Sequence, residues 1–368
     1  MHILNIMQCT NLGGMEQASL RLMQVLQKRG YSFEVVSVNA LGPLAPKLAE
    51  SCISAVGVPF EGRMGWRSHF RLRRVLRPIQ ADTVFMTGPT LSGILALGSR
   101  PRERRVLTVH FHHTGVQPRW AWRALYRLVL TRFQVVTFPS HFIRNEALEI
   151  LPDLAPISHT VYNPLRDPPL PGADDRAKAR RRLRLPVDRP IIGNAGWLIP
   201  RKRFDVFLQV ARRVADRIPD ALFVIAGDGA ERGPLKKLAE ELRVSDHTVW
   251  LGWQQNLDDF YQSLNVLLFN SDWDAMGLTP LEAAAFGVPV VASVLHGGLV
   301  EILGDGGAAL LTAWHDIDHL AYACVQMIQD AGLAARIGLL GRDRVESRCS
   351  DQEAADGYEV LLAKTAAS

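Results

Sequence analysis

The sequence predicts an α/β protein made of two doubly wound parallel sheets. Over residues 2–38, an apolar strand, a glycine-containing loop, a helical pattern and a second strand follow one another. This order opens a doubly wound sheet, because two parallel strands need a crossover between them. The same order starts again over residues 190–217, and 368 residues suffice for two domains with separate cores.

The composition fits a folded protein of a reducing compartment. The chain is 48% hydrophobic and 21% charged, with a formal net charge of +5. Its four cysteines lack metal-site or CxxC spacing, which favours free thiols over a disulfide framework. The start of the chain lacks the features of a signal peptide, and the longest uncharged run, residues 283–300, is interrupted by Pro289 and glycines. We therefore expect a cytoplasmic protein without a membrane span.

The loop after the first strand, residues 2–7, contains two adjacent glycines. Gly13 and Gly14 allow a ligand to approach the backbone closely, and the helical pattern that follows ends at Gly30. A Gly-Gly turn also occurs for structural reasons alone. The sequence GxGxxG with a downstream acid is absent, so a Rossmann dehydrogenase is disfavoured.

Histidines follow the strand expected over residues 106–111. Ligands of open α/β sheets bind beyond the carboxyl ends of the strands, where His110 and His113 fall. A metal site is disfavoured because this extended segment has no carboxylate nearby. Two interpretations remain open, a histidine beside a ligand and a buried histidine with satisfied hydrogen bonds.

Residues 61–132 are strongly basic, with fourteen arginines against three acidic residues. Two amphipathic helices are expected there, over residues 66–76 and 120–130, with tryptophan among the arginines. Such helices suit the interface of an anionic membrane. A solvated face or a face for an acidic acceptor is the alternative, and nucleic acid is disfavoured because no recognition motif accompanies the charge. The side chains expected on this membrane or acceptor face are Arg67, Arg71, Arg74, Trp120 and Arg123.

The second half of the chain begins after a linker with a short basic helix, residues 164–190. A strand over residues 190–195 leads into a turn with Lys202 directly before the next helix. A lysine in this place can pair with a diphosphate as a flexible point charge. A surface lysine is the alternative interpretation.

The stretch from residue 271 to 293 carries the densest chemistry of the chain. An apolar strand precedes it, a turn falls at Gly277, and a helix runs from about Thr279 to Gly287 before a second strand. The amides of Gly277, Leu278 and Thr279 are free donors at a helix N-terminus, which favours an anion such as a phosphate.

Two carboxylates flank this anion site. Asp274 lies in the loop before the helix, and Glu282 lies one turn inside it, eight positions later. The arrangement suits a ligand with hydroxyls at both ends and phosphates between, which is the shape of a nucleotide sugar. An ordinary strand–helix–strand unit with a surface aspartate is the alternative.

The stretch resembles the donor-site signature of the retaining glycosyltransferases of family 4, which have the GT-B architecture. That signature has two glutamates eight positions apart, with Gly, an aromatic residue, Gly and Leu after the first. Glu282 matches the second glutamate, and Gly277 and Leu278 match the glycine and leucine. Asp274 stands for the first glutamate, with a side chain shorter by one methylene, and Met276 stands for the aromatic residue.

Other segments are similar to the same family. The Gly13-Gly14 loop resembles the one that caps the donor diphosphate. The pattern Gly-Arg-Leu followed by Lys-Gly has Lys202 at the lysine, Trp197 at the arginine and Arg203 at the glycine. The resemblance therefore implies one of two arrangements: Arg201 or Arg203 replaces one phosphate cation, or the donor is held more through backbone amides and Lys202.

The resemblance also implies roles for the candidate residues. Those implied to be catalytic are His110 beside the transferred sugar, with His113 as the runner-up, Asp274 on sugar hydroxyls and Glu282 on the ribose. No metal or other cofactor is implied, because fixed cations and helix dipoles take its place. The residues implied for donor binding are Gly13, Gly14, Lys202, Arg203, Trp253, Gln254, Gly277, Leu278, Thr279 and Glu282.

The resemblance covers nearly the whole chain and implies two Rossmann-like domains that face a cleft. Residues 1–164 would bind the acceptor, residues 165–350 the nucleotide sugar, and a helix in residues 351–368 would cross back to the first domain. The implied activity is retaining transfer of a sugar from a nucleotide-diphosphate sugar to a lipid-linked or cell-envelope glycan, on the inner face of the cell membrane. A nucleotide-sugar epimerase of the same architecture and a non-catalytic glycan-binding or nucleotide-binding subunit are the alternatives.

Overall fold

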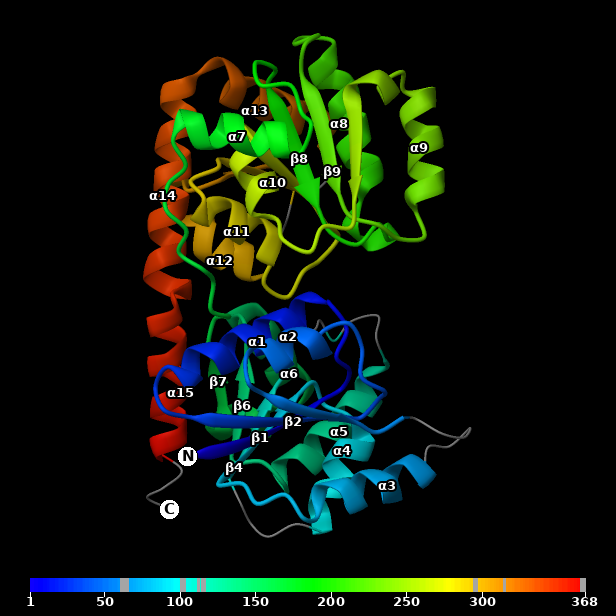
Figure 1. Ribbon diagram of the computed structural model, residues 1–368, viewed down its shortest axis with the longest axis vertical. Helices are drawn as coiled ribbons and strands as arrows, with labels where there is room; N and C mark the ends of the chain where they lie inside the picture. The colour runs from blue at the N-terminus through cyan, green and yellow to red at the C-terminus, as the bar shows by residue number, and fades with distance from the viewer. Residues whose placement is uncertain are drawn as a thin grey trace. The chain divides into compact units, whose positions relative to one another are not determined.

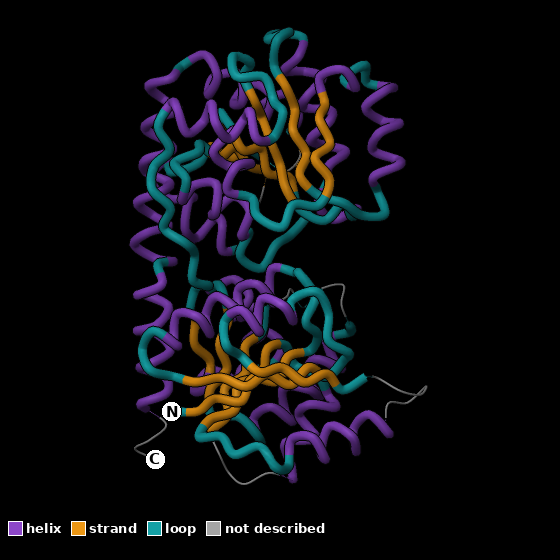
Figure 2. The backbone as a smooth tube through the Cα atoms, in the orientation of Figure 1, coloured by secondary structure: helices purple, strands orange, loops and turns teal. Residues whose placement is uncertain are grey.

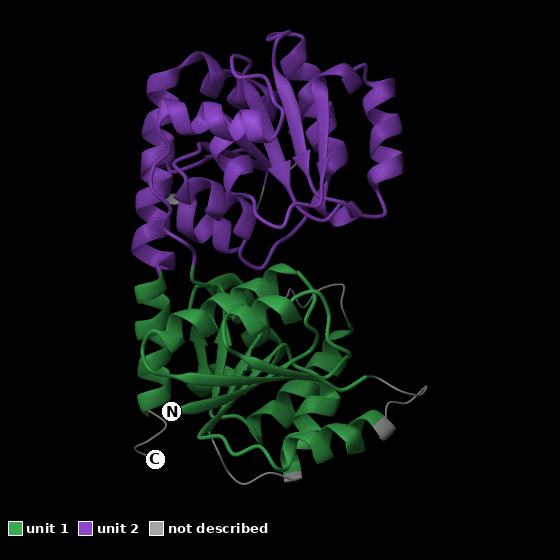
Figure 3. Ribbon diagram, in the orientation of Figure 1, with its two compact units in different colours: residues 1–164, 351–368 green, residues 165–350 purple. Residues whose placement is uncertain are grey.

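The computed structural model describes residues 1–59, 66–99, 104–110, 113, 117–293, 297–313 and 316–364. The chain divides into two compact units, residues 1–164 with 351–368 and residues 165–350, called unit 1 and unit 2 below (Figure 3). Each unit holds one parallel sheet with helices around it (Figure 2). The predicted fold class is confirmed.

Unit 1 has a sheet of seven strands in the order β3-β2-β1-β4-β5-β6-β7, and all pairs are parallel (Figure 1). Its elements are β1 (His2–Met7), α1 (Gly14–Gln27), β2 (Ser32–Ser37), α2 (Ala45–Glu50), β3 (Ser54–Gly57), α3 (Trp66–Leu76), β4 (Thr83–Thr87), α4 (Leu91–Ala96), η1 (Leu97–Ser99), β5 (Arg104–Thr108), α5 (Arg119–Leu130), β6 (Val135–Phe138), α6 (His141–Ile150), η2 (Pro152–Ile157), β7 (Ser158–Thr160) and α15 (Asp351–Lys364).

The last helix of the chain, α15, completes the core of unit 1. Its apolar side chains Tyr358, Leu361 and Leu362 are buried in the same cluster as residues of β1, β2 and α1. The Tyr358 hydroxyl lies 3.2 Å from the Thr137 hydroxyl on β6. Arg21 on α1 donates to the Asp351 carboxylate at the start of the helix. Burial and charge pairing together therefore attach this distant segment to the first unit.

Unit 2 has a sheet of six strands in the order β10-β9-β8-β11-β12-β13, again with parallel pairs. Its elements are α7 (Ala173–Arg182), β8 (Ile191–Ala195), η3 (Pro200–Lys202), α8 (Phe204–Ala215), β9 (Leu222–Ala226), α9 (Arg232–Glu241), η4 (Ser245–His247), β10 (Thr248–Gly252), α10 (Asp258–Ser263), β11 (Val266–Asn270), α11 (Leu278–Ala285), β12 (Val290–Ser293), α12 (Gly298–Leu303), η5 (Asp305–Gly307), β13 (Leu310–Leu311), α13 (Ile317–Gln329) and α14 (Ala331–Cys349).

The central strands of unit 2 are buried along their whole length. Every residue of β8, β9 and β11 is buried, as continuous apolar strands covered on both faces require. The helix α11 begins at Leu278, one residue before the predicted start, because Gly277 takes a left-handed conformation with φ of 76° and ends the loop there. Gly287, with φ of 71°, follows the helix as predicted.

Each sheet reverses its strand order once. The reversal in unit 1 lies between β1 and β4, and that in unit 2 lies between β8 and β11. In open parallel sheets ligands bind beyond the carboxyl ends of the strands at this switch point. The loops that follow β8 and β11 carry Lys202 and Asp274, so the topology alone brings these distant segments together.

Candidate functional site

The two loops at the switch point of unit 2 are tied to each other through their backbones. The Asp272 amide donates to the Arg201 carbonyl over 2.9 Å. At the start of α11, the Thr279 hydroxyl donates to the Ala195 carbonyl, at the end of β8, over 3.2 Å. The loops after β8 and β11 therefore form one surface with the start of α11.

The first turn of α11 offers uncapped amides to this surface. Gly277 is the N-cap and supplies no side chain to receive a hydrogen bond. The amides of Leu278 and Thr279 therefore have no side-chain cap, and Pro280 has no amide hydrogen. Together with the helix dipole this end of α11 favours an anion.

A compact cluster of charges lies beside the helix start. The Lys202 ammonium pairs with the Asp274 carboxylate, and it also lies 5.3 Å from the ring centroid of Phe269. The Arg201 Nη1 is 3.9 Å from the same carboxylate. Because only 14% of the Lys202 side chain and 22% of the Asp274 side chain are exposed, water screens this pair weakly.

Arg201 is oriented by its neighbour Trp273. Its guanidinium carbon lies 4.2 Å from the centroid of the indole, and its Nη1 donates to the Trp273 carbonyl over 2.8 Å. Stacking and this hydrogen bond hold the cation beside Asp274. Of the two arginines that the sequence offered as a replacement phosphate cation, Arg201 is thus the one in the Lys202 cluster.

Arg203 has a different set of partners. Its guanidinium donates to the carboxylates of Asp205 and Asp272 over 2.9 to 3.1 Å. These residues line a groove of about 470 Å³ that also contains Glu231. Three carboxylates against one guanidinium in the lining disfavour a diphosphate in this groove. Arg203 also has a φ of 47°, a conformation that favours glycine, the residue that the family pattern has here.

Glu282 lies one turn inside α11 and is held by a neutral donor. The hydroxyl of the buried Tyr261 donates to its Oε2 over 2.6 Å. Burial raises the pKa of Glu282 above its ordinary value, against the opposing effects of this hydrogen bond and of the Arg166 charge. The hydrogen bond from Tyr261 spans 21 residues of sequence, so no local pattern in the sequence predicts it.

Trp253 and Gln254 follow β10 at the same edge of the sheet. The Gln254 side-chain amide donates to the Leu251 carbonyl over 2.8 Å, so part of it serves the local turn. The Trp253 ring lies against Trp197, the residue in place of the family's arginine, with centroids 4.4 Å apart. The loop after β10 therefore meets the loop after β8 through two indoles.

In unit 1, the glycine loop after β1 is shaped by a buried glutamate. A Cβ at Gly13 would lie 2.4 Å from the Glu16 Oε2, so a side chain there forces the carboxylate to move. Glu16 also accepts a hydrogen bond from the Cys9 thiol over 2.8 Å. Burial and this hydrogen bond raise the pKa of Cys9 to about 11. Gly13 thus has a structural reason to be glycine, and Gly14 is the first residue of α1.

The two histidines of unit 1 have contrasting surroundings. His113 is buried, with its ring paired to the Tyr126 hydroxyl and its Nδ1 3.4 Å from the Glu146 carboxylate, as in the structural interpretation. His110 lines a small cavity of about 10 Å³ with polar residues such as Asn163. Desolvation lowers the pKa of His110 to about 4, so its ring is neutral at pH 7. His112 lies outside the described residues.

The arginines expected on a membrane or acceptor face lie on α3 and α5. Arg71, Arg74 and Arg123 are exposed, and Trp120 has 74% of its surface in water. The Arg67 side chain lies outside the described residues. The helix α4, which was not predicted, contacts both α3 and α5 (Figure 1). Its Leu91 and Leu95 are exposed by 58% and 43%, as is Phe70 on α3 by 58%.

Two negative findings hold for the described ranges. No group of three or more His, Cys, Asp or Glu side chains among them could hold a metal ion. No helix among them has both the length and the apolar character needed to cross a membrane.

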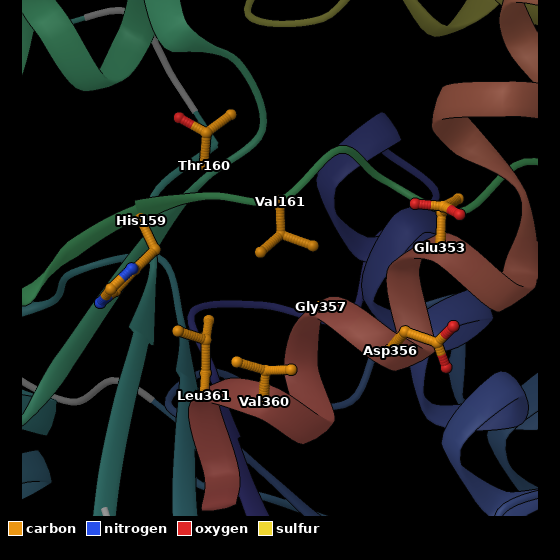
Figure 4. Close-up of a pocket in the computed structure, with 8 residues that line it drawn as sticks. All are labelled: His159, Thr160, Val161, Glu353, Asp356, Gly357, Val360 and Leu361. Carbon is orange, nitrogen blue, oxygen red and sulfur yellow. The ribbon is translucent and has the colours of Figure 1, made fainter. Parts of the chain in front are cut away.

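A groove in unit 1 lies apart from all the predicted site residues. It has a volume of about 340 Å³ between β7 and α15, and His159, Val161, Gly357 and Leu361 line it (Figure 4). Its acid Asp356 is already paired with Arg29 over 2.9 Å. We assign it no role in the chemistry.

Two domain-sized Rossmann-like units with loops converging at a sheet switch point define the GT-B class of fold. A crystal structure of Anabaena HepE with UDP-glucose is similar over 99% of this chain and 100% of its own, with a TM-score of 0.85 and 18% identity, a likeness that concerns the fold.

Family models match both halves of the chain. The model described as Glycosyltransferase Family 4 matches residues 12–167, and the model described as Glycosyl transferases group 1 matches residues 175–344. A mannosyltransferase of Mycolicibacterium smegmatis, named GDP-mannose-dependent alpha-(1-6)-phosphatidylinositol monomannoside mannosyltransferase, is 28% identical over 74% of either chain. The lipopolysaccharide core biosynthesis glycosyltransferase LpsE of Rhizobium meliloti is 31% identical over 52% of this chain and 54% of its own.

The chain belongs to the GT-B glycosyltransferases of family 4 type. It is a glycosyltransferase that uses a nucleotide-sugar donor.

Proposed function

We propose that this protein moves a hexosyl group from a nucleoside-diphosphate sugar to a hydroxyl of a lipid-linked or cell-envelope glycan, with retention of the anomeric configuration. The observation that carries the proposal is the convergence at the start of α11. Lys202 pairs with Asp274 in the loop before two uncapped helix amides, and Glu282 lies one turn inside the same helix, at the switch point of the sheet. Cations and amides of this kind bind a diphosphate, and the carboxylates accept hydrogen bonds from hydroxyls on either side of it.

The main chemical task in this scheme is to stabilise the departing diphosphate. Lys202 and Arg201 supply positive charge, and the amides of Leu278 and Thr279 supply oriented donors. Preorganised donors aimed at developing charge contribute more than any other single effect in many enzymes. Fixed cations and a helix dipole would then take the place of a metal ion.

The carboxylates would position the two ends of the donor. Glu282, steadied by Tyr261, would accept hydrogen bonds from the ribose hydroxyls. Asp274 would accept them from the sugar, while Lys202 divides its donors between Asp274 and the diphosphate. His110 would lie near the sugar as a neutral ring, and Gly13 and Gly14 would approach the diphosphate by resemblance to the family.

Retention would follow if the leaving phosphate and the incoming hydroxyl occupy one face of the sugar. The transition state would resemble an oxocarbenium ion, with the acceptor proton passing to the departing phosphate oxygen. The protein then needs no carboxylate directly behind the anomeric carbon.

The basic face of unit 1 supports a membrane-bound acceptor. Arginines are exposed on α3 and α5, and so are Trp120 on α5 and Leu91 and Leu95 on α4, the helix that contacts both. Cations attract anionic lipids by about 1 kcal/mol each, and apolar side chains enter the interface. The names of the two relatives, on phosphatidylinositol mannoside and lipopolysaccharide, agree with such an acceptor. We propose that this face rests on the inner surface of the membrane.

A product assay tests the chemistry. The protein would be incubated with UDP-glucose or GDP-mannose and a membrane lipid extract, and the linkage of the product determined by NMR. We expect an α-linked product from these α-linked donors. A β-linked product excludes retention, and an epimerised nucleotide sugar without acceptor indicates the epimerase instead.

Vesicle sedimentation tests the membrane face. We expect vesicles with anionic lipid to sediment the protein and neutral vesicles to leave it in solution. A variant with Arg71, Arg74 and Arg123 replaced by glutamine should stay in solution, whereas Arg213→Gln on unit 2 should sediment as the wild type. Equal behaviour with both kinds of vesicle argues against the anionic surface.

A further inference from the structure

Two tryptophans lie side by side at the carboxyl edge of the unit 2 sheet. The ring centroids of Trp197, after β8, and Trp253, after β10, are 4.4 Å apart, with 41° between the ring planes. Aromatic rings at this separation attract each other. Trp197 nevertheless keeps 44% of its surface exposed. One indole is therefore fixed by the other while much of its own ring is open to solvent.

The backbone that carries Trp197 is firmly held. The Leu198 amide donates to the Asp228 carbonyl over 2.9 Å, and the Glu231 amide donates to the Leu198 carbonyl over 3.0 Å. A Cβ at Gly227 would lie only 1.9 Å from the Gly196 carbonyl oxygen, so the two loops touch through their backbones. An exposed indole on such a loop is preorganised to receive a planar ring.

The loop that carries Trp197 reaches the anion site. A Cβ built at Gly196, the residue before Trp197, would lie 4.0 Å from the Lys202 Cε. The two indoles therefore belong to the loops that follow β8 and β10, and the first of these loops also carries Lys202. A nucleoside diphosphate has the matching order of groups, a flat base joined through one ribose to two phosphates.

We propose that Trp197 and Trp253 form a stacking platform for the base of the donor nucleotide, an inference that rests on the proposed function. The family pattern has arginine at position 197, so this chain exchanges a phosphate contact for a stacking contact. Arg201, held on Trp273, supplies the second cation in its place. Stacking of the base on the two indoles therefore adds to the donor affinity that Lys202 and Arg201 supply through the diphosphate.

Calorimetric titration of the full chain separates the contribution of the base to donor affinity from that of the diphosphate. The ligands are UDP, GDP and ADP on one hand, and inorganic pyrophosphate on the other. Loss of base stacking on an aromatic side chain weakens binding about ten- to a hundredfold. We expect this loss for the tightest nucleotide with Trp197→Ala and Trp253→Ala, and no change for pyrophosphate. Tyr322→Ala, an exposed aromatic residue on α13 of unit 2, is the matched control and should change neither.

Three further variants keep the test decisive. Trp197→Phe retains a ring and should bind the nucleotide nearly as tightly as the wild type, even if an alanine variant fails to fold. Trp197→Arg should bind pyrophosphate more tightly and lose the extra affinity that the base confers. Lys202→Ala should weaken nucleotide and pyrophosphate alike.

The outcomes for the platform and for the proposed function differ. A folded Trp197→Ala that binds the nucleotide as tightly as the wild type overturns the platform, and so does equal weakening of nucleotide and pyrophosphate. A folded wild type that binds none of the three nucleotides contradicts the proposed function as well.

Discussion

The two carboxylates of the candidate donor site lie in contrasting surroundings. Asp274, in the loop after β11, is paired with Lys202 and lies near Arg201. Glu282, inside α11, accepts a hydrogen bond from the uncharged Tyr261 and has a pKa raised by burial. One carboxylate is thus fixed by charges and the other by a neutral donor, so the same functional group serves as an ionic anchor in one place and as a hydrogen-bond acceptor in the other.

Removal of the Lys202 charge, which holds Asp274, should have the largest effect on activity. Lys202→Ala deletes the charge nearest the departing diphosphate and leaves Asp274 without its main partner. We expect kcat/KM to fall by about 10²-fold or more. Steady-state kinetics measures this, with Lys237→Ala, an exposed lysine on α9, as the control. Turnover near that of the wild type in Lys202→Ala rejects the diphosphate assignment.

Removal of the Tyr261 hydroxyl, the neutral donor to Glu282, should have the second largest effect, on stability and on donor binding. Tyr261→Phe leaves the Glu282 carboxylate without its hydrogen bond, which should reduce the free energy of unfolding by about 1–3 kcal/mol. We also expect weaker donor binding, because Glu282 is then free to rotate. Denaturant unfolding and nucleotide titration measure the two effects. Tyr322→Phe, an exposed tyrosine on α13, should change neither, and a Tyr261→Phe protein as stable as the wild type contradicts the account.

Replacement of Arg201 and replacement of Arg203 should have different effects on the affinity for pyrophosphate. Arg201→Ala is expected to weaken binding about tenfold, the loss of one charge-assisted contact. Arg203→Gly should leave pyrophosphate affinity unchanged, since its guanidinium is bound to Asp205 and Asp272. The left-handed backbone of Arg203 costs about 1–2 kcal/mol of folding free energy, and glycine relieves this cost. The same substitution removes the ion pairs of Arg203, which opposes the gain. If Arg203→Gly weakens pyrophosphate binding and Arg201→Ala does not, the second phosphate cation is Arg203.

The smallest effect should appear in the pH dependence of stability. Because the folded pKa of Glu282 is raised, folded Glu282 keeps a proton that the unfolded chain has lost between the ordinary and the raised pKa. Its contribution to the free energy of unfolding is therefore present below the ordinary pKa and falls as pH rises through that window. Urea unfolding across this range should show a fall for the wild type relative to Glu282→Gln. Parallel curves exclude a raised pKa.

Local rules of sequence explain how much of this arrangement was predictable. Gly277 ends a loop in a left-handed conformation, and a lysine before a helix follows a parallel strand, so backbone preferences and topology were enough to indicate this edge of the sheet. The same rules predicted the helices α3 and α5 from the spacing of their charged and apolar residues. The roles of the individual side chains stay predictions.

Contacts between distant segments were not predictable in this way. The Tyr261 hydrogen bond to Glu282 and the contact of Trp197 with Trp253 depend on which loops meet at the sheet edge. The pairing of Lys202 with Asp274 was also missed, because each was considered only as a ligand-binding group. Nor does the sequence distinguish Arg201 from Arg203, since neighbours in a turn point their side chains to different partners.

The most direct test of the account is a crystal structure of the protein with a bound nucleoside-diphosphate sugar. We expect the diphosphate oxygens within hydrogen-bond distance of the Lys202 ammonium and the Leu278 and Thr279 amides, with a ribose hydroxyl on Glu282. A diphosphate bound elsewhere, with the start of α11 left in contact with solvent, contradicts the account.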